Sequence, residues 1–541
     1  KEIESFTQEH VFISSVHGND ITYNDMVEEV CLENSQIQQA FSGATVLLSG
    51  GTGFLGKLLI EKLLRSCPDI KKLYLLARPK KNKDTAKRFQ EQFDDMLYHK
   101  LKKVNPDFTE KIQVIEGEIS LLDLGISDVD RQKIINEVEF IFHGAATVRF
   151  DENLKSAVNI NVRASKGMLM LARACTKLKA YVHVSTAYSH CTRSEIDEVF
   201  YDTTLDGDKL IDLVENMDDK VIADITPGLL GDYPNTYAFT KAAAEDVVLK
   251  YSRGLPVALF RPSIVIATAD DPIVGWIDNV YGPTGVVVGS AVGLLHVLNC
   301  NQKNIADLVP GDVVVNACIA VAWKTARDHR DNHEAPPQDT VPVVYNCVSS
   351  VESPVTWEQY MKLNEGYGLK VPPIQAIWGY LLILTPSAFL YTIYSFILHW
   401  IPAYIIDAVL VIIGKKPMLK QAYKKIQKFS GVIGYFALRQ WKFYNNNMQS
   451  LYKEMGVADK TIFKCSMAGF DWSHYFYNHV RGIRVYLLKD PLDTVPQGLR
   501  KQLKLRLLSV LLMAVLGFVM LRLLVWFVRW IIVYLLFEHH Y

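Results

Sequence analysis

Residues 45–56 read TVLLSGGTGFLG, a pattern that predicts a strand, a tight turn and the start of a helix. The apolar, β-branched run ends at Ser49, as expected of a buried strand. Residues 57–67, KLLIEKLLRSC, follow with helical spacing, so free N–H groups at the helix start would face a phosphate. The pattern predicts a dinucleotide-binding fold, with a purely structural glycine turn as the alternative. The residues predicted to line the cofactor here are Gly50, Gly51, Thr52, Gly53, Phe54, Leu55 and Gly56.

The composition limits the class of protein. With 541 residues the chain exceeds the usual size of one domain, and its formal net charge of zero gives no sign of a nucleic-acid partner. The eight cysteines are scattered, without a CxxC pair or metal-ligand spacing. We therefore expect reduced cysteines, in the core or on the surface of a cytosol-facing protein, and no metal site. No secretory leader is recognisable after Lys1.

The second predicted strand, residues 73–77, bears on the choice of cofactor. An acidic residue at its end would bind the ribose hydroxyl of NAD, but this strand is followed by Arg78, Lys80 and Lys81. Positive charge suits the 2′-phosphate of NADP, so Arg78 predicts NADPH. Ordinary surface cations are the alternative.

Further strands alternate with helical segments. Residues 111–119, 138–148 and 180–188 have strand character, and this alternation predicts an α/β fold with a Rossmann-like, doubly wound parallel sheet. Ligands bind at the carboxyl ends of such strands, where Ala145 would let a cofactor lie close. His143 beside it is expected to be a packing residue.

A set of catalytic side chains follows the fifth strand. Tyr237 and Lys241 are four residues apart in a helical segment, which places them on one helix face. An ammonium group favours the ionised form of a nearby phenol, so the pair could exchange a proton with a carbonyl oxygen. The hydroxyl of Thr186, or less favourably of Ser185, could hold the same oxygen. A solvated surface pair is the alternative.

Several motifs resemble known families. SGGTGFLG, HVSTAY and NTYAFTK resemble the extended short-chain dehydrogenase/reductases. A wider set resembles the alcohol-forming fatty acyl-CoA reductases, through most of residues 41–350 and more loosely to about residue 490. The turn departs from the family's frequent TGATGFLG, with Ser49 and Gly51 in place of Thr and Ala. The motifs of this wider set are residues 142–150, 224–227, 231–237, 261–265, 275–279 and 306–310.

The resemblance implies a reaction and roles for residues. Two NADPH would reduce a long-chain or very-long-chain acyl-CoA through an aldehyde to a primary alcohol, a precursor of waxes and ether lipids, with release of CoA and no metal. Tyr237 would donate the proton, Lys241 would also hold the nicotinamide ribose, and Thr186 or Ser185 would position the carbonyl. Pro262 would lie against the cofactor. The alternatives are a reductase of a sterol or free aldehyde and a catalytically silent membrane-bound binding protein.

We expect four consecutive parts. Residues 1–40 form an extension, residues 41–350 the NADPH-binding catalytic domain, residues 351–495 a helical membrane-associated domain and residues 496–541 a transmembrane anchor. The oligomeric state stays open, with a homo-oligomer as one alternative.

An apolar stretch lies in the third part. Residues 374–406 contain no Asp, Glu, Lys or Arg and are long enough to cross a bilayer core of about 30 Å, but Pro386 and Pro402 interrupt them. The pattern predicts a monotopic or hairpin-like element in contact with membrane lipid. Buried helices of a soluble domain are the alternative. The lysines that follow the stretch are Lys415, Lys416, Lys420, Lys424, Lys425 and Lys428.

The C-terminal segment predicts a membrane anchor. Residues 507–521 are nearly all apolar, although Arg522 and Arg529 interrupt the apolar run that comes next. Four cations within residues 500–506 should stay cytosolic, leaving the catalytic domain in the cytosol, on an endoplasmic reticulum or peroxisomal membrane. A helix lying in one leaflet is the alternative.

Overall fold

The computed structural model describes residues 35–79, 85–203, 205–331 and 340–538. The chain forms two compact units. Unit 1 comprises Lys1–Ile273, Asp307–Pro354 and Trp441–Phe470, and unit 2 comprises Val274–Ala306, Val355–Gln440 and Asp471–Tyr541. The units are therefore discontinuous in sequence, whereas we expected consecutive parts. Lys80 and Lys81 lie outside the described residues.

Unit 1 is built on a parallel sheet of seven strands, in the order β11-β7-β5-β4-β1-β2-β3. This confirms the predicted doubly wound α/β fold. The order reverses between β1 and β4, the edge at which such sheets bind their ligands. The strands are β1 (Thr45–Ser49), β2 (Lys72–Ala77), β3 (Ile112–Glu116), β4 (Phe140–His143), β5 (Ala180–Val184), β7 (Val257–Pro262) and β11 (Val343–Cys347).

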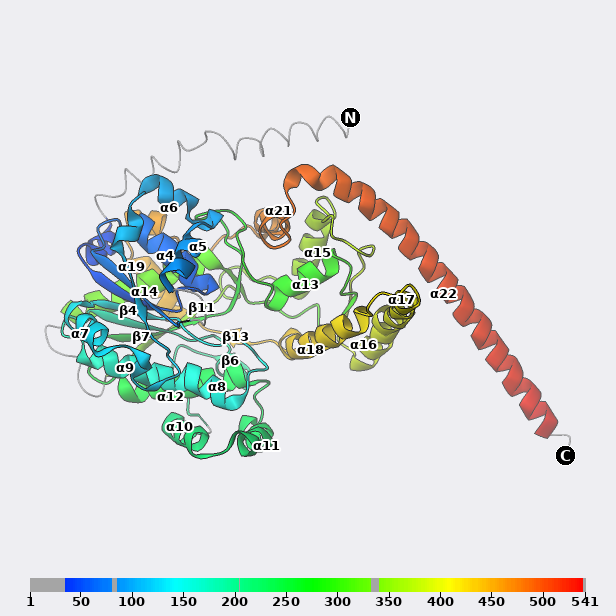
Figure 1. The fold of residues 1–541 in the computed structure, drawn as a ribbon, viewed down its shortest axis with the longest axis horizontal. Helices are drawn as coiled ribbons and strands as arrows, with labels where there is room; N and C mark the ends of the chain where they lie inside the picture. Colours follow the sequence, from blue (N-terminus) through cyan, green and yellow to red (C-terminus); the bar gives the residue numbers. More distant parts are fainter. Residues whose placement is uncertain (1–34, 80–84, 204, 332–339, 539–541) are drawn as a thin grey trace. The chain divides into compact units, whose positions relative to one another are not determined.

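Helices cover both faces of this sheet (Figure 1). Helices α4 (Phe54–Ser66) and α14 (Gly311–Asp331) pack together on one face, and α9 (Ala164–Ala174) and α12 (Thr236–Tyr251) pack together on the other. Since side chains alternate along a strand, each strand supplies residues to both layers. The strand residues in the core beneath α9 and α12 are Leu47, Tyr74, Leu76, Ile115, Ile141, Tyr181, Leu259 and Val344.

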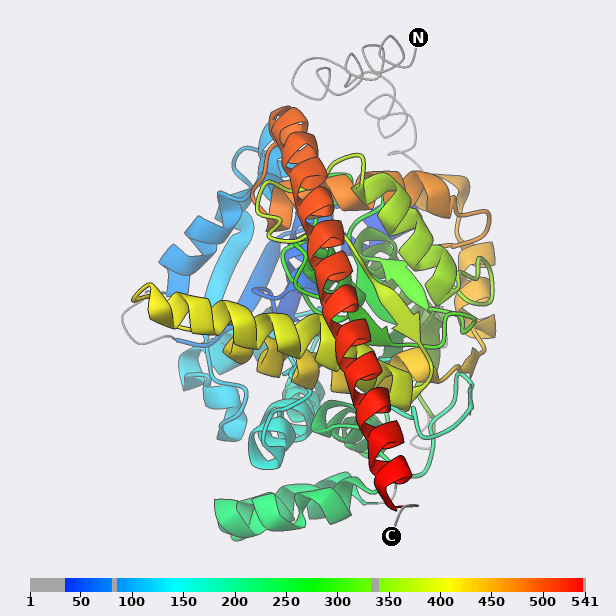
Figure 2. The ribbon, with the colours of Figure 1, turned by 90° about the vertical axis from the view of Figure 1, so that its right-hand side faces the viewer.

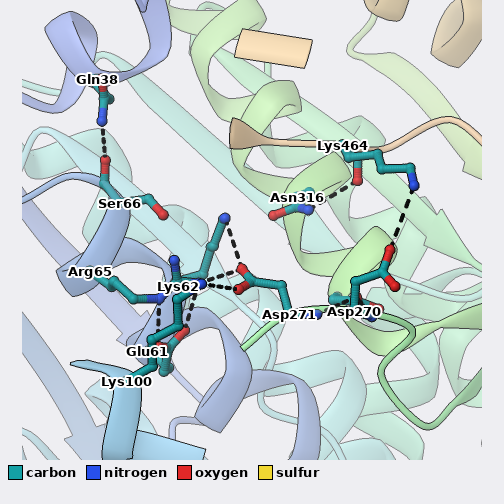
Figure 3. A network of polar contacts seen from close by, with 11 residues as sticks. Gln38, Glu61, Lys62, Arg65, Ser66, Lys100, Asp270, Asp271, Asn316 and Lys464 are labelled. Atoms are coloured by element: carbon teal, nitrogen blue, oxygen red, sulfur yellow. Dashed lines mark hydrogen bonds and ion pairs between the residues drawn. The ribbon is translucent and has the colours of Figure 1, made fainter. Parts of the chain in front are cut away.

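A charged network fixes the later turns of α4 (Figure 3). Asp271 accepts hydrogen bonds from Lys62 at 3.0 Å and from Lys100 at 3.2 Å, and it also pairs with Arg65. Arg65 in turn donates to Glu61 at 2.7 Å. Burial alone would raise the pKa of Asp271, but the cations outweigh it and hold that pKa well below its usual range.

We predict that Asp271→Asn lowers the free energy of unfolding by roughly 2 to 4 kcal/mol, because it leaves the buried Lys62 without its anion. Chemical denaturation of the full chain would measure the loss. Asp94→Asn is the matched control: its pair with Lys102 is exposed, so the change should stay within about 0.5 kcal/mol. Equal effects of the two variants would contradict a structural role for the buried network.

Unit 2 is mainly helical, as expected. One short parallel pair, β9 (Val297–Asn299) with β12 (Ile383–Thr385), lies among its helices. The helices are α13 (Gly282–Ala291), α15 (Trp357–Gly368), α16 (Ala388–Ser395), α17 (Ile401–Ile412), α18 (Leu419–Leu438), α21 (Trp472–Gly482) and α22 (Val495–Glu538), and the π-helical turns are η7 (Phe396–Trp400) and η8 (Ile483–Leu487).

Among the described residues, two helical segments are long and apolar enough to cross a membrane. The first is Ala388–Ile412, formed by α16, η7 and α17, and the second is Leu492–Val533. Most of the second segment belongs to α22, one unbroken helix (Figure 2). Their length and composition are compatible with membrane association.

Candidate active site

The glycine turn between β1 and α4 has the geometry of a phosphate cradle. Gly50 has a φ of 88°, a conformation that favours glycine, and a Cβ there would lie 2.8 Å from the Ala145 nitrogen. A Cβ at Gly56 would lie 2.1 Å from the Gly50 oxygen. Thr52 and Gly53 are exposed at the start of α4, where backbone N–H groups can meet an anion. This close backbone packing fixes the turn whose N–H groups could meet the pyrophosphate of a dinucleotide.

The remaining cofactor candidates lie at strand ends. Arg78 follows Ala77, the last residue of β2, and is exposed, with its Nε 3.5 Å from Glu118. Ala145 follows β4 and donates its N–H to Ser49 Oγ at 3.3 Å. Pro262 ends β7, and its carbonyl accepts the N–H of Ala187 at 2.9 Å.

The structure brings Thr186, Tyr237 and Lys241 together after β5. Asn235 caps α12 by accepting the N–H of Ala238 at 2.8 Å, which places Tyr237 in the first helical turn. The side chains of Thr186 and Tyr237 are hydrogen-bonded. One turn further along α12, the Lys241 ammonium donates to the Val184 carbonyl at 2.8 Å. A hydroxyl, a phenol and an ammonium thus gather at the carboxyl end of a central strand.

Ser185 faces a different partner. Its hydroxyl donates to Glu245 at 2.5 Å, so Thr186 is the better candidate for holding a substrate oxygen. Glu245 is buried and is also bonded to His190 at 2.9 Å and to the Arg261 guanidinium at 2.5 Å. Sequence reasoning missed Glu245, although it lies four residues after Lys241 and therefore on the same face of the helix.

Burial sets the electrostatics of this group. It raises the pKa of Tyr237 to about 12, against the lowering effect of the Thr186 hydrogen bond. It lowers the pKa of Lys241 to about 8, against the Glu245 carboxylate, which raises it. In this structure the pKa of Tyr237 is set by burial and by Thr186, so the effect of Lys241 on the phenol stays a prediction. Tyr237 is protonated at neutral pH, which is the state that a proton donor needs.

We predict that Glu245→Gln shifts the alkaline limb of the profile of kcat/KM against pH to lower pH. The limb should begin near the Lys241 pKa of about 8, because activity needs the ammonium form. Without the Glu245 carboxylate, the charged form of Lys241 is less stabilised, so the pKa of Lys241 falls further. Asp232→Asn, an exposed change near the start of α12, should leave the limb in place. An unmoved or rising limb in Glu245→Gln would contradict this link.

A second missed residue connects two elements of the site. Asn161 lies in the π-helical turn η6 (Asn159–Arg163), accepts the Thr147 N–H at 2.9 Å and donates to Thr240 at 2.9 Å. It therefore ties the segment after β4 to α12. Such π-turns often occur at functional sites, but no spacing in the sequence predicts one.

His143 lies buried at the end of β4. Its Nδ1 lies 2.7 Å from Ser49 Oγ, and burial lowers the pKa of His143 to about 3. It is therefore an uncharged packing residue at neutral pH. Within the described ranges no group of three or more His, Cys, Asp or Glu side chains could hold a metal ion.

The fold and site together define a class of protein. A parallel sheet with a glycine cradle at its switch point, and a Thr–Tyr–Lys group beside it, is the arrangement of a reductase that uses a nicotinamide cofactor.

Comparison with known proteins narrows the class. Two family models described as male sterility protein match residues 48–318, by the NAD-binding model, and residues 398–490. Fatty acyl-CoA reductase wat of Drosophila melanogaster is 41% identical over 89% of this chain and 92% of its own length. Human fatty acyl-CoA reductase 1 is 37% identical over 87% of this chain and 90% of its own. The chain belongs to the fatty acyl-CoA reductase family.

A solved structure supports the fold. The reductase domain of a nonribosomal peptide synthetase from Mycobacterium tuberculosis aligns with a TM-score of 0.54 and 19% identity, covering 85% of this chain and 99% of that domain.

Proposed function

We propose that the protein reduces long-chain fatty acyl-CoA to a primary alcohol with NADPH as the reductant, releasing coenzyme A and passing through an aldehyde. The observation that carries the proposal is the Thr186–Tyr237–Lys241 group at the end of β5, in a chain of this family. Alcohols of this kind are precursors of waxes and ether lipids.

Thr186, Tyr237 and Lys241 would have different roles at the substrate carbonyl. A bound reduced nicotinamide supplies the hydride. Thr186 and Tyr237, already hydrogen-bonded to each other, would hold the substrate oxygen from two sides, and the protonated phenol would donate as negative charge develops there. Lys241 would hold the nicotinamide ribose and keep a positive charge near the phenol.

The decisive experiment measures thiol release. Purified protein with a long-chain acyl-CoA and NADPH should release coenzyme A, seen with a thiol probe, while lipid analysis finds the matching primary alcohol. Oxidation of NADPH with a free aldehyde but never with acyl-CoA would favour the alternative of an aldehyde or sterol reductase. No turnover with either would favour a binding protein.

Arg78 supports the proposal of NADPH over NADH. Its exposed guanidinium follows β2, where a cofactor's 2′-phosphate lies in this fold. We predict that Arg78→Ala raises the KM for NADPH by roughly tenfold, a loss of about 1.4 kcal/mol, and leaves the KM for NADH unchanged. Arg253→Ala, at an exposed position just after α12, is the matched control. Equal changes for both cofactors would exclude Arg78 from selecting NADPH.

The membrane location is part of the proposal. We infer that α22 anchors the protein in an endoplasmic reticulum or peroxisomal membrane with the catalytic site in the cytosol, because exposed apolar side chains fill its later turns and four cations precede them. A chain lacking residues 507–541 should leave the membrane fraction or become extractable at high salt. Retention as strong as that of the full chain would contradict α22 as the anchor.

A further inference from the structure

The segment Ala388–Ile412 has a polar inner face and an apolar outer face. Its buried residues are Ser395, Leu398, His399, Ala403 and Asp407, of which three are polar, and their helical spacing places them in one stripe. This is the reverse of a helix on a water-soluble surface, because the outer face needs an apolar partner. The exposed apolar side chains are Phe389, Leu390, Ile393, Phe396, Tyr404, Ile405, Ile406, Val409, Val411 and Ile412, with exposures up to 82%.

Helix α18 packs against α17 and η7. The Asp407 carboxylate caps α18 by accepting the N–H groups of Met418, Leu419 and Lys420 at 2.9 to 3.0 Å. Further along, the His399 and Tyr423 rings stack with centroids 4.8 Å apart. These contacts fix which residues of α18 lie beside which part of the apolar segment.

Lysines therefore lie beside the middle of the apolar segment. Lys424 and Lys425 are exposed and directly follow Tyr423, whose ring stacks on His399, so their backbone lies near the level of His399. If the segment crossed a bilayer, both lysines would lie near the centre of that bilayer. Each charge there would cost about 2.5 to 3.5 kcal/mol. The register is thus unfavourable for a span, although length and composition allow one.

Charge identifies the partner of the outer face. Residues 388–438 contain six lysines and a single carboxylate, Asp407, which is occupied as the cap of α18. Lys415 and Lys416 are exposed in the turn before α18, and Lys424 and Lys425 continue the row. Apolar side chains bordered by lysines match acyl chains bordered by phosphates.

We propose that α16, η7, α17 and α18 form a monotopic docking surface that lies in the interface of an anionic lipid leaflet. The apolar face enters the acyl region and the lysines contact lipid phosphates. This inference rests on the proposed membrane location and adds a second attachment that is separate from α22.

The test uses the full chain reconstituted in phosphatidylcholine vesicles with or without phosphatidylserine. A benzophenone amino acid at Ile412 should crosslink to lipid, and several-fold more when phosphatidylserine is present. The same group at Val129, on the unit 1 surface, should not crosslink to lipid. Protein that floats with vesicles but crosslinks at Ile412 to protein, or to nothing, would overturn the proposal. Protein that does not float would instead contradict the anchor.

Charge-reversal variants test whether the lysines beside the apolar segment, and not the overall charge of the protein, cause the effect of phosphatidylserine. Lys416→Glu/Lys424→Glu/Lys425→Glu should remove the enhancement by phosphatidylserine. Lys177→Glu/Lys209→Glu/Lys220→Glu, at exposed positions of unit 1, should keep it. Equal behaviour of the two triple variants would contradict a specific role for the α18 lysines.

Topology distinguishes docking from crossing. In sealed vesicles that turn over externally added NADPH, Lys416→Cys should react with a membrane-impermeant maleimide as readily as Val129→Cys. Both reactions are measured above the labelling of the unmodified chain. Labelling at Lys416 only after detergent would show that the segment crosses the bilayer and would overturn the proposal.

Discussion

Tyr237→Phe should lower turnover of acyl-CoA by about a hundred- to ten-thousand-fold, the usual contribution of a positioned proton donor. The variant keeps the ring, which packs 5.7 Å from the Phe150 ring, and removes the group that meets Thr186. Cofactor affinity should stay near that of the unmodified protein, because the glycine cradle is untouched. Steady-state kinetics and a fluorescence titration with NADPH measure the two effects.

Tyr233→Phe is the matched control, since Tyr233 is a half-buried tyrosine that precedes α12 and packs edge-on against Phe239. It should retain most turnover. Turnover of Tyr237→Phe within a few-fold of the unmodified protein would remove Tyr237 from the mechanism. A loss of NADPH binding in this variant would assign the phenol to cofactor binding.

Local patterns were sufficient to predict the sheet and the turn. The strand ending at Ser49 and the glycines after it have few alternative conformations, and residues 73–77 pair beside them as expected. The four-residue spacing of Tyr237 and Lys241 also predicts one helix face, and both lie in α12. These features depend on interactions between residues that are close in sequence.

These local patterns could not predict contacts between residues that are far apart in the sequence. Residues 441–470 return to unit 1 after the helices of unit 2 have begun, and no composition change marks that return. The direction of Ser185 depends on Glu245, sixty residues away. In the sequence, Pro386 and Pro402 interrupt one apolar stretch. In the structure Pro386 precedes the Ser387 cap, and Pro402 follows the π-helical turn η7.

Gly56→Ala should weaken NADPH binding at least tenfold, about 1.4 kcal/mol, and lower the free energy of unfolding by about 1 to 3 kcal/mol. Alanine is otherwise the better helix former, so its intrinsic effect in α4 would be stabilising. The added Cβ would lie 2.1 Å from the Gly50 oxygen, and the Gly51 Cα would be 2.8 Å away. Both neighbours are backbone atoms, so the clash can be relieved only by moving the turn that would hold the pyrophosphate.

Gly228→Ala in α11 (Asp219–Leu230) separates the clash from the substitution itself, because a Cβ there meets nothing within 4 Å. This control should be neutral or slightly stabilising in thermal denaturation and should bind NADPH normally. If Gly56→Ala lost stability but kept cofactor affinity, the turn would have a structural role only, the alternative that the glycine pattern allowed. If it lost affinity with little change in stability, the close approach of the backbone at Gly50 would be needed mainly by the ligand.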